Sequence, residues 1–431
     1  MNKFFKFLII ICAIIIFQLI TVELPAQNIN ARFTTSVYTW EQQESKTESA
    51  THVRAYQLAQ ISIGKLGLPG LSFHSYFNLS HDFSEKAVDD PRIWLYNCYF
   101  NLKTLRNTTD FSVGRQRIYA GVGYGTIDGL QVKYRFKDYF NLKVYAGTLA
   151  PLRKSYEMEE LNSDNISFGF HLTSAKLKIV RIGISYARFS RTPVRYKTAG
   201  IYTSNFRLEH PVSSLQKHLI GLDLKSFITT KLKVQGRLDY NFAMHTIKRG
   251  EIGGRYEINK TFEIGLDYIY RMPSIDLNSI FSVFTIHQNE EIAFRTRYRW
   301  KNYNFFVNYA LTFFEGENNH RRGLGCSWKS LYFGYNNRNG YGGDSDAITL
   351  NYMYPLKEKL NLTIGTYFAS YKIVSSEENR NNLIGSSLGC VYRMNKKLTL
   401  QANVQFLKNK LFSQDFRFFF RGSYAFFHRS K

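Results

Sequence analysis

The sequence is poor in the residues that shape disulfide-rich, zinc-binding and loop-rich proteins. Its 431 residues include only four cysteines and eight prolines. Beyond Cys12, the cysteines are Cys98, Cys326 and Cys390, an odd number with wide spacing, so they indicate neither a disulfide framework nor a metal site. Cys390 has the setting of a small apolar strand residue. Scarce proline suits long continuous strands, because proline cannot donate a ladder hydrogen bond. We expect no metal and no cofactor.

Long apolar runs are also absent, with one exception at the start of the chain. Lys3 and Lys6 precede an apolar run from Phe7 to Ile20, and Leu24-Pro25-Ala26 follows it. The run has about 14 residues, fewer than the roughly 20 that a membrane-spanning helix needs. This arrangement predicts a cleaved secretory signal peptide over residues 1–26 and argues against a helical membrane protein.

Motifs of enzymes are missing as well. The glycine-rich segment 121–125 is not followed by a helical pattern, and neither a P-loop nor a zinc-protease motif is present. Adjacent His81 and Asp82 are expected in an external loop, where such a pair is usually incidental. We therefore expect no enzymatic activity.

The residues that are abundant indicate an outer-membrane β-barrel. Aromatic residues make up 16% of the chain, with 30 Tyr and 36 Phe, beside 21% charged residues. Soluble domains seldom combine these two features. An outer-membrane barrel does so because an apolar, aromatic outer band and a polar interior alternate along each strand.

Alternation with a period of two residues supports the same fold. From Lys397 to Phe406, apolar residues occupy one face and Lys, Thr, Gln and Asn the other, and segments 231–242 and 262–271 repeat the pattern. A helix would scatter these residues around a cylinder. The pattern predicts strands with one apolar and one polar face.

The connections are expected to alternate between short periplasmic turns and longer external loops. Short turns are predicted at 138–139, 259–260, 301–302, 329–330 and 395–396, and longer excursions at 41–50, 83–90, 117–126, 150–163, 190–216, 272–289, 315–321 and 372–382. Lys176–Arg188 changes phase near Val180, which predicts a bulge. We therefore predict an all-β fold, a single closed antiparallel transmembrane barrel of 18–22 strands, with 22 as the count, over residues 27–431.

Two resemblances support this class. The last strand carries Phe416, Phe418, Phe420, Tyr424 and Phe426 in alternation and resembles the C-terminal assembly signal of outer-membrane barrels, although that family usually ends on the aromatic residue and here the tail His428-Arg429-Ser430-Lys431 follows. This resemblance implies recognition by the barrel-assembly machinery.

The second resemblance lies in Gly114-Arg115-Gln116, followed by Gly121, Gly123, Gly125 and Asp128-Gly129. This segment looks like part of the porins of the alginate-export type. It covers about 25 residues, so it implies a channel class and no particular solute.

The segment 294–300 carries the strongest candidate for a pore-lining group. Arg295, Arg297 and Arg299 share one face, and Phe294, Tyr298 and Trp300 share the other. A basic residue on the lipid side near the midplane would cost roughly 2–4 kcal/mol, so the arginines should face the lumen. Two interpretations stay open: a ladder that selects ions, or a hydrated wall paired with Glu263 and Asp267, expected two strands upstream. Further residues expected to line the pore are Lys231, Lys233, Arg237, Glu263, Asp267, Arg271, Lys133 and Arg135.

The chain is strongly basic. The net charge is +24, and it becomes +23 without residues 1–26 because these contain two lysines and one glutamate. Basic rings or ladders in a pore favour anions, and excess charge in external loops could contact lipopolysaccharide phosphates. Nucleic-acid binding is not expected, because the basic residues are spread singly over strands and the chain carries an export signal.

One predicted external loop, 279–286, is apolar on alternate residues. Ile280, Phe281 and Phe284 are candidates for a constriction or hydrophobic gate in the lumen. A strand extension beyond the membrane or a contact at the rim would explain the same pattern.

The sequence favours a porin-like channel in the bacterial outer membrane, which passes small polar solutes by passive diffusion and favours anions. The alternative is a barrel without a channel that has a structural or adhesive role at the cell surface. A transporter of hydrophobic substrates would need an apolar lumen, and a plugged TonB-dependent transporter a globular segment before the first strand; the sequence favours neither. The solute and the oligomeric state stay open.

Overall fold

The computed structural model describes residues 28–43, 49–84, 90–104, 108–137, 139–151, 156–174, 179–192, 214–273, 287–340, 343–372, 379–410 and 414–429. Regular structure in these residues consists of strands. They are β1 (Asn28–Gln43), β2 (Ser49–Gly64), β3 (Leu71–Asp82), β4 (Arg92–Lys103), β5 (Thr109–Ala120), β6 (Gly123–Phe136), β7 (Phe140–Leu149), β8 (Ser167–Ser174), β9 (Val180–Ser190), β10 (Leu215–Phe227), β11 (Leu232–Asn241), β12 (Thr246–Glu257), β13 (Phe262–Arg271), β14 (Asn289–Trp300), β15 (Tyr303–Phe314), β16 (Glu317–Trp328), β17 (Leu331–Asn339), β18 (Ser345–Lys357), β19 (Leu360–Tyr371), β20 (Asn381–Arg393), β21 (Leu398–Lys408) and β22 (Asp415–Arg429).

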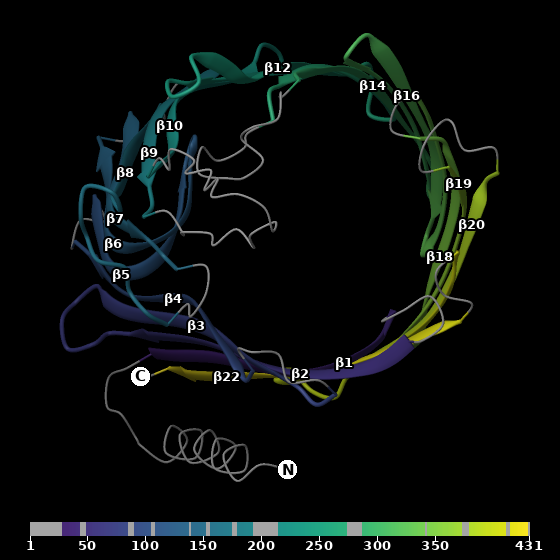
Figure 1. Cartoon of the computed structure of the whole chain (residues 1–431), viewed down its shortest axis with the longest axis horizontal. Helices are drawn as coiled ribbons and strands as arrows, with labels where there is room; N and C mark the ends of the chain where they lie inside the picture. Colours follow the sequence, from purple (N-terminus) through teal and green to yellow (C-terminus); the bar gives the residue numbers. More distant parts are fainter. Residues whose placement is uncertain are drawn as a thin grey trace, which may run out of the picture.

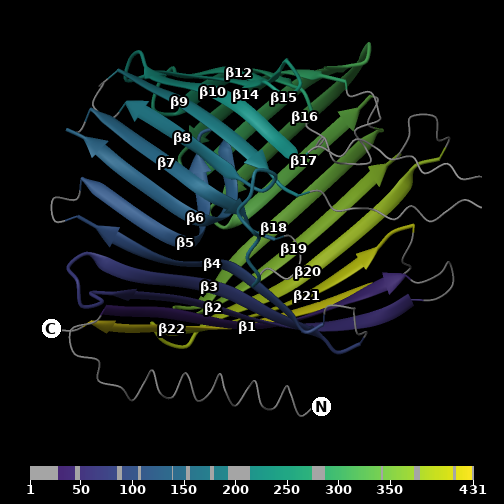
Figure 2. The ribbon, with the colours of Figure 1, turned by 60° about the vertical axis from the view of Figure 1, so that its left-hand side comes forward.

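These strands form one closed antiparallel barrel of 22 strands, as predicted. Each strand pairs with its neighbours in sequence, and β1 closes the ring on β22 from Asn28↔Arg429 to Thr39↔Phe418. Figure 1 shows the ring along its axis, and Figure 2 shows the tilt of the strands that closure requires. The described part of the chain holds no helix long and apolar enough to cross a bilayer.

The apolar and polar faces of each strand explain why the chain folds into a closed barrel. Leu266 and Leu388, each 57% exposed, point outward with many other large apolar side chains. Asp267, the next residue after Leu266, points to the other face and is buried. Because successive side chains alternate, an apolar outer surface fixes a polar inner one.

The connections follow the predicted rhythm at most positions, with four corrections. Segment 117–126 belongs to β5, β6 and the tight turn between them, and segment 315–321 is a turn at 315–316 followed by β16. Val180 is the first residue of β9, so the apparent phase change there marks the start of a strand; the register shift of this pair lies between Leu215 and Lys217 on β10. His81 and Asp82 end β3 and do not lie in a loop.

The β5–β6 hairpin departs from the barrel wall. β4 pairs with β5 only as far as Cys98↔Arg115, and β6 pairs with β7 only as far as Ile127↔Leu149. β5 and β6 continue to pair with each other up to Ala120↔Gly123. Gly114 lies where β5 leaves β4: its φ is +119°, and a Cβ there would meet the Cys98 carbonyl oxygen at 2.4 Å. In Figure 2 the blue ends of this hairpin lie inside the barrel.

The tip of the hairpin packs against the inner wall. Ile118, Ala120 and Val122 are buried and form one cluster with side chains from β7, β9 and β10, namely Tyr145, Leu149, Ala187, Phe189 and Leu219. A Cβ at Gly221 on β10 would lie 2.4 Å from Val122 Cγ1, so glycine makes room for the tip. Gly221 and Ser185 are central in their strands, which places the tip at mid-height of the wall.

Candidate functional site

The inner surface of β13, β14 and β16 carries a concentrated group of charges. Phe294, Tyr298 and Trp300 of β14 are 42%, 42% and 50% exposed on the outer face. Alternation therefore directs the intervening Arg295, Arg297 and Arg299 inward, where the wall also contributes acids. We call the following eight residues the luminal charge network: Arg271, Arg295, Arg297, Arg299, Arg321, Glu263, Asp267 and Glu291.

Two arginines of β14 pair with acids of β13. Arg295 Nη2 lies 3.0 Å from Asp267 Oδ2, and Arg297 Nη1 lies 3.9 Å from Glu263 Oε1. β13 is the strand directly hydrogen-bonded to β14, so the prediction that these acids lie two strands away is wrong. One connection, residues 272–288, joins β13 directly to β14, and among the described residues no further strand lies between them. Arg299 is exposed and has no ion pair within the described residues.

Neighbouring strands extend the pairing. Arg321 Nη2 lies 3.1 Å from Glu291 Oε1, and Arg271 Nη2 lies 3.8 Å from Glu251 Oε1. A recess of about 360 Å³ opens beside Arg295 and Arg321 and is lined also by Asn308 and Asn336. This wall therefore offers guanidinium and amide donors to a solute, although most of its cations already have a carboxylate partner.

The remaining predicted cations fall into two groups. On β11, Lys233 Nζ lies 2.8 Å from Glu257 Oε1 and Arg237 Nε lies 3.0 Å from Asp239 Oδ1. Lys231 is placed differently from the prediction: it precedes β11 in a turn, where its Nζ donates to the Ile258 carbonyl oxygen over 3.4 Å.

Lys133 and Arg135 lie on β6, away from the network along the ring (Figure 1). Arg135 Nη2 lies 3.4 Å from Asp110 Oδ2. The structure thus brings the predicted residues of β11–β14 onto one stretch of wall and leaves these two on another. The candidate gate residues Ile280, Phe281 and Phe284 lie outside the described residues.

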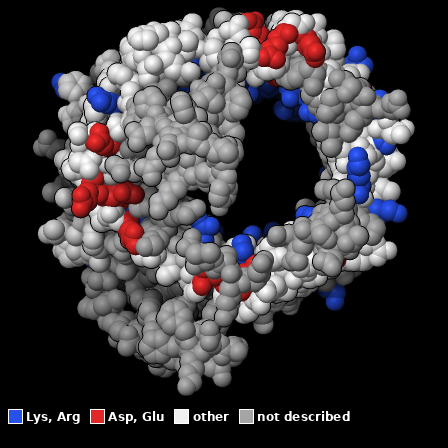
Figure 3. Space-filling model, viewed as in Figure 1, with Lys and Arg blue, Asp and Glu red and all other residues white. Residues whose placement is uncertain are grey.

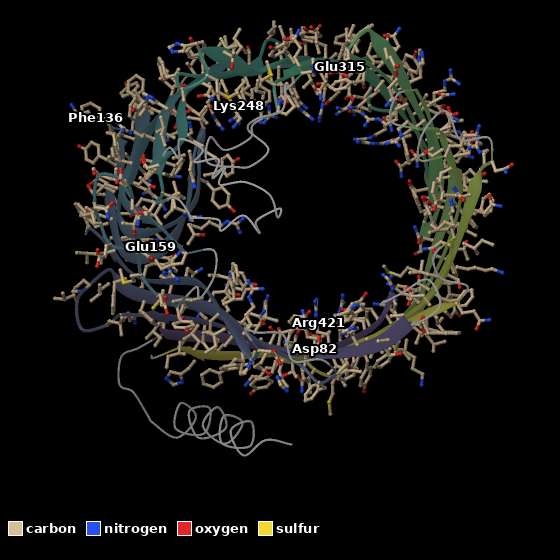
Figure 4. The ribbon with its side chains drawn as sticks, in the orientation of Figure 1. Asp82, Phe136, Glu159, Lys248, Glu315 and Arg421 are labelled. Carbon is tan, nitrogen blue, oxygen red and sulfur yellow. The ribbon has the colours of Figure 1, made fainter. Side chains whose placement is uncertain are left out.

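Sequence reasoning missed an aromatic stretch on the inner wall near the barrel closure. Tyr38 stacks on Trp40 with ring centroids 5.4 Å apart, and Trp40 stacks on His52 at 5.0 Å. Arg421 lies over Phe419, 4.9 Å from its centroid, and Figure 4 places Arg421 on the inner side of this wall. The alternation did contain the signal, because Tyr38 shares a strand face with Thr34 and Ser36.

Sequence reasoning also missed the role of Arg115 and Asp128 at the base of the inward hairpin. Both are buried, and the guanidinium binds the carboxylate through two contacts of 2.6 and 2.5 Å. Arg115 Nη2 donates in addition to the Glu157 carbonyl oxygen at 2.6 Å. The pair joins β5 to β6 at the point where both leave the wall, so it fixes the direction of the hairpin.

The described residues include no group of three or more His, Cys, Asp or Glu side chains that could hold a metal ion. Within the same residues Cys98, Cys326 and Cys390 are free thiols.

Comparisons with known proteins agree with the fold and go no further. No family model matches the sequence, and no curated protein matches it. Among solved structures, the siderophore receptor PirA from Pseudomonas aeruginosa is similar with a TM-score of 0.56 and 12% identity, over 92% of this chain and 80% of that one. PirA from Acinetobacter baumannii has a TM-score of 0.56 and 9% identity over the same shares.

OccAB3 from Acinetobacter baumannii matches over 93% of this chain and 99% of that one, with 11% identity and a TM-score of 0.43. At these identities the likeness concerns the fold alone. Together with the closed ring of 22 strands, the likeness to the two PirA structures shows that this chain has a closed β-barrel fold.

Proposed function

We propose that residues 1–26 are a cleaved signal peptide and that residues 27–431 form an outer-membrane channel for passive diffusion of small polar solutes, with anions favoured. The observation that supports this proposal is an opening along the barrel axis, bordered by Lys and Arg side chains at several places (Figure 3). Such an opening, closed on its outside by an apolar surface, has the form of an aqueous pore.

The balance of charge supports the preference for anions. The luminal charge network contains five arginines and three acids, a net charge of +2, and Glu251 of the neighbouring β12, which pairs with Arg271, reduces the sum to +1. Basic side chains along a pore favour anions, and partial pairing keeps the attraction weak enough for a solute to leave. Arginine stays protonated at any accessible pH, so this charge is constant.

The proposed partners follow from the surface and the last strand. The outer face binds lipid, basic side chains near the external rim would contact lipopolysaccharide phosphates, and the aromatic alternation of β22 would be read by the barrel-assembly machinery. Transport of this kind requires no cofactor and no bond chemistry.

Swelling of proteoliposomes tests the proposal. Vesicles that contain the refolded barrel should swell in isotonic solutions of small sugars and amino acids, with rates that fall as the solute grows. Vesicles with heat-denatured protein provide the control. If the folded barrel is inserted and no solute enters the vesicles, the proposed channel function is wrong, and a structural or adhesive role explains the barrel better.

A further inference from the structure

The inward hairpin has one face on the barrel wall and another that looks into the lumen. Ile118 and Ala120 are buried on the wall side, so alternation directs Arg117 and Tyr119 to the opposite side. Tyr119 is 59% exposed, and its cross-strand neighbour Tyr124 is 53% exposed. Two tyrosine rings therefore stand side by side on the luminal face, near mid-height of the channel.

A cation flanks each ring. The Arg117 guanidinium carbon lies 5.1 Å from the Tyr119 ring centroid, and Lys217 Nζ on β10 lies 4.1 Å from the Tyr124 ring centroid. Within the described residues neither cation has a carboxylate partner. We call Arg117, Tyr119, Tyr124 and Lys217 the luminal ledge. No carboxylate of the described residues compensates its charge, in contrast to four of the five arginines of the luminal charge network.

The ledge is held firmly. The Val122 amide donates to Ser185 Oγ over 3.1 Å, and Lys143 Nζ donates to the Tyr119 carbonyl oxygen. Together with the buried apolar cluster and the Arg115–Asp128 pair, these contacts fix the hairpin at both its tip and its base. A rigid ledge reduces the ordering cost of binding, which favours specific solute contact.

We propose that the luminal ledge is a binding site for phosphate monoesters carried on a planar ring, such as nucleoside monophosphates. A phosphate monoester carries a charge of about −1.5 to −2 at neutral pH, which matches two cations without a carboxylate partner among the described residues better than a single carboxylate does. The exposed parts of the tyrosine rings supply a stacking surface for the base, and stacking of this kind tolerates different bases. The proposal rests on the channel function proposed above and names the solute class that the channel would concentrate.

Blockade of single-channel current tests the ledge. Adenosine monophosphate should reduce the current of the wild-type barrel in a concentration-dependent way. Adenosine has the ring without the charge, and inorganic phosphate has the charge without the ring; each should block at least about tenfold more weakly. Arg117→Gln, and separately Tyr119→Ala with Tyr124→Ala, should raise the half-blocking concentration of adenosine monophosphate by about three- to tenfold.

Two further variants keep the test decisive. Arg393→Gln removes a cation of β20, on the opposite side of the ring (Figure 1), and should leave the half-blocking concentration within about twofold. Replacement of residues 117–126 by Asn-Gly, a dipeptide suited to a two-residue hairpin, should abolish the block and raise the conductance. Equal block by adenosine monophosphate and phosphate in a conducting wild-type barrel would overturn the proposed binding site at the luminal ledge and would not contradict the proposed channel function. A folded wild-type barrel that does not conduct would overturn the channel itself.

Discussion

Replacing Arg295, Arg297 and Arg299 together by glutamine should move the ion preference of the pore toward cations. The change lowers the charge of the luminal charge network from +2 to −1, because two arginines and three acids remain. Asp267 and Glu263 also lose their ion-pair partners and become available to cations. The side chains repeat roughly every 6.5–7 Å along the strand, within the screening length of about 10 Å at 0.1 M salt, so they act as one patch.

The barrel should stay folded in this variant. The two arginines that form pairs are 47% and 52% exposed, and ion pairs of such exposure contribute about 0–1 kcal/mol each. Glutamine remains polar and hydrated at these positions. Loss of stability should therefore be small, and the heat-dependent gel mobility of the folded barrel should persist.

The assay is the reversal potential across a planar bilayer with a tenfold KCl gradient, where complete selectivity corresponds to about 59 mV. We expect a shift on the order of 10 mV toward cation preference at moderate salt, and a smaller shift near 1 M salt. The matched control, Glu263→Gln with Asp267→Asn, removes the opposite charge and should shift the potential in the opposite direction. An unchanged reversal potential in a conducting triple variant would refute the reasoning and reduce the arginines to a hydrated wall.

Three further predictions concern the wall and the hairpin. In a variant without the native cysteines, a water-soluble thiol reagent should label cysteines at Thr399, Gln401 and Asn403 and spare those at Leu400 and Ala402; equal labelling would contradict the register. Leu388→Arg should destabilise the barrel by roughly 2–4 kcal/mol in denaturant unfolding from lipid, whereas Ser387→Arg, which points inward from the next position, should cost about 1 kcal/mol or less; equal costs would mean that the faces are assigned wrongly. Arg115→Ala should cost about 3–5 kcal/mol because it leaves the buried Asp128 carboxylate unpaired, and Arg115→Gln with Asp128→Asn should recover part of the loss; a cost below about 1 kcal/mol would show that the pair does not hold the hairpin.

The fold could be predicted from the sequence because the two-residue period leaves few options. In β21, Leu398 and Leu400 oppose Thr399 and Gln401, and such a strand is stable only between an apolar and a polar medium. The tight turn at 301–302 fixes where one strand ends and the next begins. Strand count and closure then follow from the rhythm of alternation and turns.

The hairpin could not be predicted by the same rule. Ile118 and Ala120 alternate with Arg117 and Tyr119 as in a wall strand, but here the apolar face turns onto the inner wall and the other face meets the lumen. The sequence predicted a longer external excursion at 117–126 and gave no sign of a hairpin that turns inward. That direction depends on contacts with β9 and β10, such as Val122 with Ser185, which are distant in sequence.

Among the predicted pore residues, some have the position that alternation predicts and one does not. Alternation places Arg295 and Arg297 on one face, and the structure pairs each with an acid of β13. Lys231 lies one residue before β11, because alternation in the sequence defines which residues share a face and does not define the residue at which a strand begins. Pairing across strands depends on register, which a single strand's sequence does not contain.

The single-channel conductance of the refolded barrel in a planar bilayer tests the central claim most directly. The account predicts discrete, stable conductance steps, a reversal potential that favours anions, and larger steps when residues 117–126 are replaced by Asn-Gly. A barrel that inserts in its folded, heat-modifiable form and gives no steps, with or without this replacement, would contradict the claim that the chain forms a channel.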